Sequence, residues 1–409
     1  MNVPKFSYGE SSFKSVNLKG RFCSDKTNFI KVLEQSGTYV KICRPRRFGK
    51  TFVCNMLEQY YDAANSKDEL HEIFAETDVL KNQLSTEEMG KYLVLRFSFS
   101  MVRVSDNHFT HENFRDYINT VVNQFCTKYH KAGLLHAPIE IDGHDAINSL
   151  RLLFDMVRVS RCQIYLIVDD FDTFTNDSLN LFGQPIQKDA FLKSWGNTMK
   201  EETLDGTIAR AFFTGVTPEN SLSSFNMMKD LTICKRLEGM FGLTSADVTR
   251  GLGMIDSLTA DQRVQYLEQM RSQYEGYRFN STQTEPMFHP HYVQYFLDHL
   301  ELFGAPPNSI IDPEVSKSVD KVAKFIVNRN RGSTAFTLKN FALGVVDQNE
   351  MHIFAREDVP AFCGSKFTPI DLRCDDLVAL AYYNGFLTFK KDHEDCSILT
   401  SPNTLVQAI

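Results

Sequence analysis

Short apolar runs alternate along the first half of the chain with longer segments whose apolar residues recur every three to four positions. Near-continuous apolar runs of this length are typical of buried strands, and the second pattern is typical of helices. Their alternation predicts an α/β fold with a doubly wound, mostly parallel sheet through about residue 235. The expected strands are "GTYVKIC" (37–43), "YLVLRFSFS" (92–100), "CQIYLIVDD" (162–170) and "TIARAFFTGV" (207–216), and the expected helices cover residues 28–36, 51–64, 111–133 and 150–160.

Beyond residue 235 the pattern becomes helical, most clearly in "LTADQRVQYLEQMRSQYEGY" (258–277). The Pro- and Asn-containing stretch "GAPPNSIIDP" (304–313) is the best candidate for a linker. Near the end, "GFLTFKKDHEDCSILTS" predicts two strands joined by a charged turn. We therefore expect an α/β domain at 1–235, a helical lid at 236–305 and a helical, winged-helix-like module at 306–409.

Composition narrows the class of protein. The 409 residues carry a net charge of -7, which argues against a chain that coats nucleic acid by bulk charge. The nine cysteines form no C-x-x-C pair, so neither a zinc knuckle nor a disulfide framework is indicated, and a reducing compartment fits best. No segment has the pattern of a signal peptide or a membrane span. We expect an intracellular protein, cytoplasmic or nuclear, without a membrane partner.

The stretch "RPRRFGKTF" (44–52) contains the glycine, lysine and threonine of a phosphate-binding loop, with Arg44 where the first glycine of G-x-x-x-x-G-K-[ST] belongs. An expected strand precedes it and an expected helix follows it, as such a loop requires. On these residues alone, a nucleotide site and a chance basic turn are equally good interpretations.

The run "IYLIVDD" supplies a second element, because it ends in Asp169 and Asp170. A phosphate loop needs an acidic side chain at the end of a neighbouring strand to hold Mg²⁺ and its water. An isolated strand ending in two aspartates is more often a solvated turn. Together with the upstream G-K-T, the pair favours a magnesium-nucleotide site.

These segments, with "SDKTNFIKVLEQ", "FFTGVTP", "FGLTSADV" and "YEGYRFN", follow the order and spacing of the AAA-ATPase-like family, which the chain resembles from about Phe13 to Ile409. The loop R-P-R-R-F-G-K-[ST] is specific to that family, so Arg44 belongs to its pattern. The resemblance implies an AAA-like P-loop NTPase fold with an additional strand, ATP and Mg²⁺ as ligands, and ATP hydrolysis. Bacterial members usually carry a C-terminal PD-(D/E)XK nuclease, whose acidic and lysine constellation is not found after "SPNTLVQAI".

The resemblance also assigns roles to residues. Lys50 would contact the β and γ phosphates, Thr51 would ligate Mg²⁺, and Asp169 would support that ion. Asp170 stands where the family usually has a catalytic glutamate, and its shorter side chain implies slow turnover. The expected nucleotide-binding residues are Arg46, Arg47, Phe48, Gly49, Lys50, Thr51, Phe52 and Asp169.

Three further positions have competing interpretations. Thr214 ends a strand where such ATPases place a sensor of the γ phosphate, although threonine favours strands in any case. Arg278 in "YEGYRFN" either reaches the phosphates from the lid or stacks on the adjacent tyrosines. His289 replaces the family's common asparagine. We also expect Arg44, Arg46 and Arg47 to form a basic collar around an anion.

The sequence thus predicts an ATP-driven conformational switch with Lys50, Asp170, Thr214 and Arg278 in catalytic roles. The alternative is a nucleotide-gated scaffold that binds a protein or nucleic acid through the C-terminal module and barely hydrolyses. Oligomer formation and the preference between ATP and GTP stay open.

Overall fold

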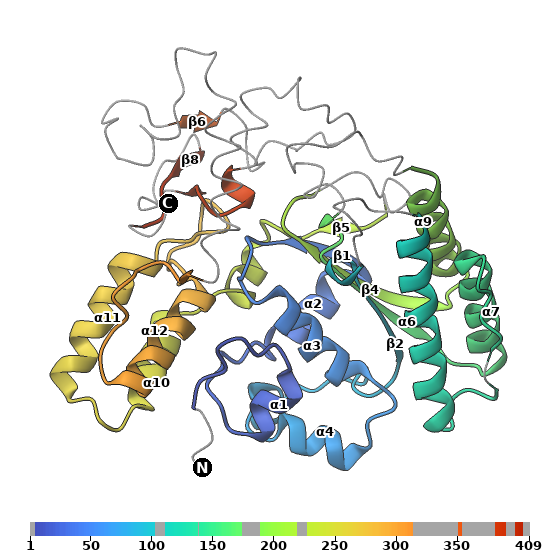
Figure 1. The fold of residues 1–409 in the computed structure, drawn as a ribbon, viewed down its shortest axis with the longest axis horizontal. Coiled ribbons are helices and arrows are strands. Elements are labelled where there is room, and N and C mark those ends of the chain that lie inside the picture. Colours follow the sequence, from blue (N-terminus) through green and yellow to red (C-terminus); the bar gives the residue numbers. More distant parts are fainter. Residues whose placement is uncertain are drawn as a thin grey trace.

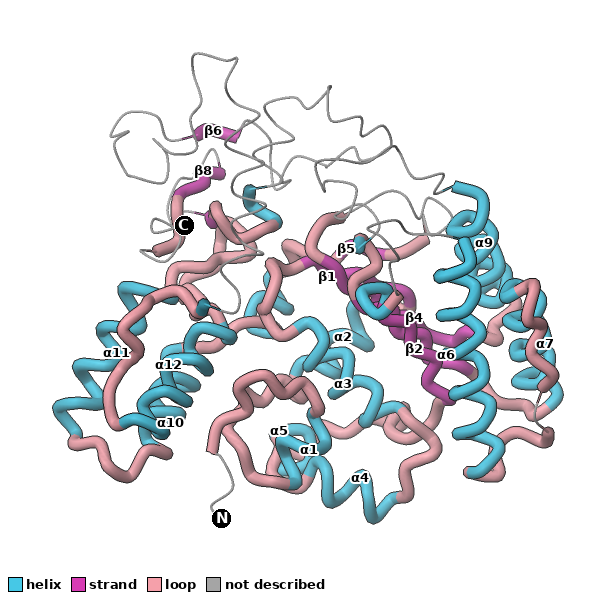
Figure 2. Tube along the Cα trace, viewed as in Figure 1, coloured by secondary structure: helices cyan, strands magenta, loops and turns pink. Residues whose placement is uncertain are grey.

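The computed structural model describes residues 5–102, 111–137, 139–173, 189–218, 227–313, 351–353, 381–389 and 397–403. Its centre is a five-stranded parallel sheet (magenta in Figure 2) in the order β2-β3-β4-β1-β5. The additional strand β4 stands between β1 and β3, so the predicted doubly wound α/β fold is confirmed. The strands of this sheet are β1 (Tyr39–Cys43), β2 (Leu93–Ser98), β3 (Ile164–Asp169), β4 (Ile208–Gly215) and β5 (Lys229–Asp230).

Helices cover both faces of the sheet (Figure 1). One face packs on α6, α7 and α9, and the other on α1 to α4. The helices of this part are α1 (Phe13–Leu18), α2 (Phe29–Ser36), α3 (Lys50–Tyr61), α4 (Lys67–Phe74), α5 (Asp78–Lys81), α6 (His111–Lys131), α7 (Ala146–Val159) and α9 (Asp189–Leu204), with short 3₁₀ turns at Phe99–Met101 and Lys235–Met240.

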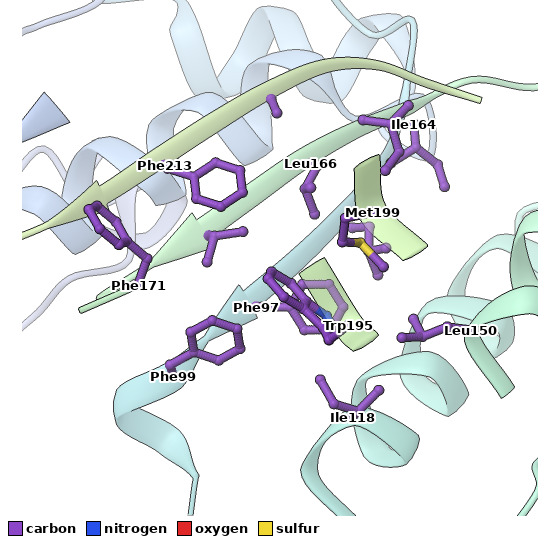
Figure 3. Close-up of a cluster of buried hydrophobic side chains, with 14 of the residues drawn as sticks. Phe97, Phe99, Ile118, Leu150, Ile164, Leu166, Phe171, Trp195, Met199 and Phe213 are labelled. Atoms are coloured by element: carbon purple, nitrogen blue, oxygen red, sulfur yellow. The ribbon is translucent and has the colours of Figure 1, made fainter. Parts of the chain in front are cut away.

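The alternation of side chains along the strands builds a core on each face. Leu166 and Phe213 point to the side of α6 and α9, where Phe97 meets the ring of Trp195 edge-on at 5.5 Å between centroids (Figure 3). Ile167, the neighbour of Leu166, faces α3 on the other side. Because both faces are covered, every residue of β3 is buried, which explains its continuous apolar sequence.

The region predicted to be a lid, residues 236–305, contains α10 (Ser245–Gly253), α11 (Ala260–Tyr274) and α12 (Pro290–Phe303), coloured yellow to orange in Figure 1. Local sequence fixes their ends. Thr244 and Thr259 each accept a hydrogen bond from the third residue of the following helix, in capping boxes, and Pro290 begins α12. These helices share a core with Phe6 and Phe22 from the N-terminal segment.

The C-terminal region includes a small antiparallel sheet in the order β6-β8-β7. The predicted strand pair is present, with Thr388 opposite Thr400. Most of the predicted winged-helix-like module lies outside the described residues, so that module and the domain boundaries stay predictions. Within the part of the chain that is described, no helix has both the length and the apolarity to cross a bilayer. These three strands are β6 (Met351–Ile353), β7 (Thr388–Phe389) and β8 (Ser397–Thr400).

Candidate functional site

The loop between β1 and α3 lies at the carboxyl ends of the parallel strands. Those ends are level, because Ser98 pairs with Asp169, Asp169 with Thr214, and Thr214 with Ile42. In open parallel sheets, ligands bind beyond this edge. The amide groups of the first helical turn have no partner within the helix and carry the positive end of its dipole, so the start of α3 favours an anion.

Two residues of the loop have left-handed backbone conformations. Gly49, which precedes α3, has φ +87°, and Arg47 has φ +65°. Glycine adopts this conformation without steric cost, whereas an arginine is strained there. Asp170 at the end of β3 is a second strained residue, with φ +53°. Such strain concentrates at functional sites, so its presence in both the loop and the acidic turn supports a binding role for this edge.

Lys50 is the first residue of α3 and is buried. Its Nζ donates hydrogen bonds to the backbone carbonyls of Arg44, at 3.2 Å, and of Pro45, at 3.0 Å. The ammonium thus lies inside the curve of its own loop. Its charge also lowers the pKa of Asp169, which places it on the side of the acidic strand end.

Asp169 is fully buried at the end of β3. Burial and the neighbouring charge of Asp170 raise the pKa of its carboxyl, while Arg96, Thr51 and Lys50 oppose that rise. Arg96 donates to Oδ2 at 3.3 Å and also to Glu58 at 3.0 Å. Oδ1 is buried and accepts no hydrogen bond from the described residues. A buried carboxylate oxygen without a donor is costly unless it faces a cation or ordered water. Asp169 and Thr51 therefore fit a Mg²⁺ ion with its water ligands.

A cavity of about 710 Å³ opens beside the loop, within the size range of ligand pockets. Four parts of the chain form its walls: the N-terminal segment, the loop, the strand ends and the lid. Every predicted nucleotide-binding residue from Arg46 to Phe52 lines it, and so does Asp170. Asp169 does not line the cavity itself and approaches it through Thr51. Tyr8, Lys26, Asp172 and His291 are among the other residues of its walls.

A family model described as "Predicted AAA-ATPase" matches residues 7–223, which is more than half of the chain. The chain belongs to this family. The match covers the N-terminal wall of the cavity, the loop and the strand ends, and it stops before the lid. None of the curated proteins compared with the chain matches it.

In this predicted AAA-ATPase, the structure does not bring Thr214 to the cavity. Its side chain is fully buried, and its hydroxyl donates to the carbonyl of Ile42 at 2.9 Å. The threonine thus helps to pair β4 with β1. Asp172 lies nearer to the ligand space, where its carboxylate accepts hydrogen bonds from the backbone N–H groups of Val216 and Thr217. The sensor role predicted for Thr214 stays a prediction that this geometry does not support.

Arg278 is also away from the 710 Å³ cavity. Its backbone N–H donates to Thr388 Oγ1 at 2.6 Å, and the hydroxyl of Thr388 donates back to the Arg278 carbonyl at 3.1 Å. The residue lines a separate small cavity of about 10 Å³ together with Pro45 and Phe279. A phosphate contact by Arg278 would need a different arrangement of the lid.

The expected collar of three arginines is wrong for Arg44. Arg46 and Arg47 are exposed at the cavity, but Arg44 is only 1 % exposed. Its guanidinium donates to the carbonyls of Cys43 and Thr232 and lies over the ring of Phe279, 4.2 Å from the centroid. No local sequence pattern indicates this orientation, because the aromatic partner is more than 200 residues away.

Sequence reasoning also missed residues that bridge the N-terminal segment and the lid. The Lys26 ammonium donates to the carbonyl of Gly239 at 2.9 Å, and burial lowers its pKa. Tyr8 and His291 both bond to Asp312, the latter through Nε2 at 2.7 Å. Lys26 falls in the family segment "SDKT", which does not indicate a partner more than 200 residues away. His291 falls in the "HPH" triplet, which does not indicate Asp312 some 20 residues further along the chain. These contacts join parts of the cavity wall that are far apart in the sequence.

Proposed function

We propose that the chain is a Mg-ATP-binding P-loop ATPase that acts as a nucleotide-driven conformational switch. Backbone amides from Arg47 to Thr51 hold the phosphates, Lys50 contacts the β and γ phosphates, and Thr51 ligates Mg²⁺. Asp169 orders the water around the ion from the end of β3. Bound Mg²⁺ supplies neutralisation of the phosphate charge. Adenine and ribose then occupy the part of the cavity between the N-terminal segment and the lid.

The observation that carries this proposal is that Lys50 and Thr51 line one cavity and that Asp169 lies directly behind them. An ammonium (Lys50), a hydroxyl (Thr51) and a buried carboxylate with an undonated oxygen (Asp169) come from two strand ends more than 100 residues apart. A chance basic turn has no reason to face a buried aspartate. The paired charges are instead what a phosphate with its metal ion requires.

Hydrolysis is assigned to Asp170, which lines the cavity one residue beyond Asp169. Its carboxylate orients the attacking water and accepts a proton from it. Because an aspartate is one methylene shorter than glutamate, the water must lie closer to the strand end or be reached through a second water. We therefore expect turnover to be slow.

A non-hydrolysing scaffold is the second candidate, and two observations favour it. The hydroxyl of Thr214 is committed to the Ile42 carbonyl, and Arg278 lines a separate small cavity, so neither residue lies at the proposed phosphate site. Such a protein would bind Mg-ATP and present its C-terminal region to a protein or nucleic acid without steady phosphate release. Assembly into an oligomer is compatible with either candidate.

Labelled ATP binding to the parent and Lys50→Ala, with and without Mg²⁺, tests the site. Loss of a hydrogen-bonded charge pair costs about 1.5–3 kcal/mol, so we expect about 10- to 150-fold weaker binding. Lys41→Ala is the matched control, because this lysine of β1 pairs with Asp230 and does not line the cavity. Equal affinity of the parent and Lys50→Ala would refute the assignment.

Phosphate release, measured on the same samples, separates the two candidates. An ATPase switch releases phosphate continuously, and Asp170→Asn abolishes the release while ATP still binds. A scaffold binds ATP with no release above that of Asp170→Asn. Competition with GTP in the binding assay decides the preference for the base.

A further inference from the structure

Arg44, Pro45 and Phe48 of the loop pack against the lid and the C-terminal region. Phe48 is buried among Tyr277, Phe279 and Met287 of the lid, and its ring meets that of Tyr277 edge-on at 4.8 Å. Arg44 lies over Phe279 from the same direction. The loop thus lies between the cavity on one side and the segment "YEGYRF" on the other.

Arg44 is unusual because its charge is buried with incomplete hydrogen bonding. Nη1 donates to two backbone carbonyls, but Nε and Nη2 have no acceptor among the described residues, and no carboxylate there pairs with it. Burial lowers its pKa to about 10, so the group stays charged at neutral pH. An unpaired buried charge costs stability. An apolar side chain would fill the space at lower cost, which indicates that the guanidinium has a role beyond packing.

The backbone of the loop is bonded to the residue that would hold the phosphates. The carbonyls of Arg44 and Pro45 accept the hydrogen bonds of the Lys50 ammonium. An ammonium has three protons, and two are directed to these carbonyls. A triphosphate that accepts hydrogen bonds from more than one of these protons must break at least one bond from Lys50 to a loop carbonyl. The peptide units of Arg44 and Pro45 then lose a hydrogen-bond donor and can shift, together with their side chains.

Pro45 also contacts the C-terminal region. A Cβ placed on Gly385 would lie 3.1 Å from the Pro45 ring, so the backbone of Gly385 packs closely against that ring. Phe279, the ring under Arg44, accepts a hydrogen bond at its carbonyl from the hydroxyl of Tyr382 at 3.3 Å. Pro45 therefore contacts residues 381–389 directly, and Arg44 contacts them through Phe279.

We infer that Arg44 is a positioning residue that ties the phosphate loop to the lid and to residues 381–389, so that nucleotide held by Lys50 changes how firmly that C-terminal segment is seated. Its Nη1 donates to the carbonyls of Cys43, the last residue of β1, and of Thr232, two residues beyond β5, while the plane of the guanidinium lies over Phe279. The inference rests on the proposed nucleotide site and adds the route by which the site reaches the C-terminal region.

Hydrogen exchange of residues 381–389 with and without Mg-ATP tests the route, with ATP affinity measured on the same samples. Coupled sites commonly influence each other by about 5-fold or more, so ATP should change the exchange of this segment by at least about that factor in the parent. Arg44→Met should still bind ATP but lose the ATP-dependent change. Phe279→Leu should do the same, because it removes the ring face and keeps the charge. Arg236→Met is the control, since that exposed arginine donates to Gln35 and lines neither of the two cavities described above.

The outcomes are distinct. If the parent does not bind ATP, the proposed function falls and the inference with it. If the parent binds ATP with no change in exchange, or if Arg44→Met and Phe279→Leu both keep the full change, the inference is overturned and the nucleotide site stands. Should Arg44→Met fail to fold, Phe279→Leu and Arg44→Lys decide the question, because lysine keeps the charge but loses the planar guanidinium, and is expected to lose most of the change.

Discussion

The two halves of the phosphate loop differ in what they contact. Lys50 and Thr51 face the 710 Å³ cavity and the acidic end of β3. Arg44, Pro45 and Phe48 send their side chains into the lid and against the C-terminal region. Within nine consecutive residues, some side chains thus face the cavity and others anchor the loop to the rest of the protein.

This difference explains why an arginine can occupy the first position of the loop. A glycine there lets a backbone turn tightly, but it offers no side chain to anchor the loop. Here the turn is obtained at Arg47 and Gly49, both left-handed, while Arg44 anchors the loop to Phe279. The cavity half should therefore control nucleotide affinity, and the lid half should control stability and coupling.

Phe48→Ala tests the lid half with the largest expected effect. The ring is 1 % exposed among aromatic and apolar lid side chains, so its removal should lower the free energy of unfolding by about 3–5 kcal/mol. Urea denaturation measures this. Arg47→Ala is the matched control one residue earlier, because its exposed side chain should change stability by about 0.5 kcal/mol or less. Equal stabilities for the two variants would contradict the division of the loop.

Gly276→Ala tests the contact between the lid and the C-terminal region. Gly276 has φ +111°, and an added Cβ would lie 2.0 Å from the backbone carbonyl oxygen of Pro402. Because neither backbone can yield without losing the hydrogen bond from Asn403 to the Glu275 carbonyl, we expect a loss of about 2–3 kcal/mol on thermal or urea unfolding. Gly253→Ala, where a Cβ meets no atom within 4 Å, should be close to neutral. A neutral Gly276→Ala would show that the two regions separate readily.

Much of the fold could be predicted, because the strands are buried on both faces and read as continuous apolar runs. The four predicted strands and the helices at 28–36, 51–64, 111–133 and 150–160 appear with ends shifted by a few residues. The strand β5 was missed, since its two residues, Lys229 and Asp230, are polar and exposed. The helix α9 was missed because its apolar spacing is weak and Gly196 interrupts it.

The site was predictable where its residues are local and was not where they depend on distant contacts. Gly49, Lys50 and Thr51 form a short motif, and Asp169 ends a recognisable strand, so both could be found in the sequence. The burial of Arg44 depends on Phe279, and the bonded hydroxyl of Thr214 depends on the register of β4 with β1. Asp172 was overlooked because its partners, Val216 and Thr217, lie more than 40 residues further along the chain.

Asp169→Asn tests the cavity half. The buried carboxylate supports Mg²⁺ through its undonated oxygen, so the amide should weaken the Mg²⁺-dependent part of ATP binding by about 10-fold or somewhat more and leave the Mg²⁺-free affinity unchanged. Titrating Mg²⁺ at fixed labelled ATP measures this. The variant should lose little unfolding free energy, because burial already disfavours the charged form of this carboxyl. Asp205→Asn, at an exposed turn, is the control. A loss of affinity that is the same with and without Mg²⁺ would argue against a metal-supporting role.

The smallest expected effect concerns His289, which lies in the lid and meets the ring of Phe48 at 4.6 Å. Burial, and next the neighbouring His291, hold its pKa well below the ordinary value of 6.5, so the folded protein keeps the ring neutral while the unfolded chain protonates it. Stability is therefore unaffected above pH 6.5 and falls as the pH drops from 6.5 towards the folded-state pKa. Between pH 6.5 and 5.5 this one group accounts for about 1 kcal/mol of lost unfolding free energy.

His289→Asn isolates that contribution, because it removes the titrating ring of His289. Burial also lowers the pKa of His291, but that histidine is present in both proteins. The difference in unfolding free energy between parent and variant should shrink by about 1 kcal/mol on going from pH 6.5 to 5.5, whatever its value at pH 7. A difference independent of pH would mean that His289 takes up a proton in the folded lid. The Phe48 ring would then stay in contact with the lid next to a charged His289. In that case Arg44 would contribute more to the anchoring of the loop than the aromatic cluster around Phe48.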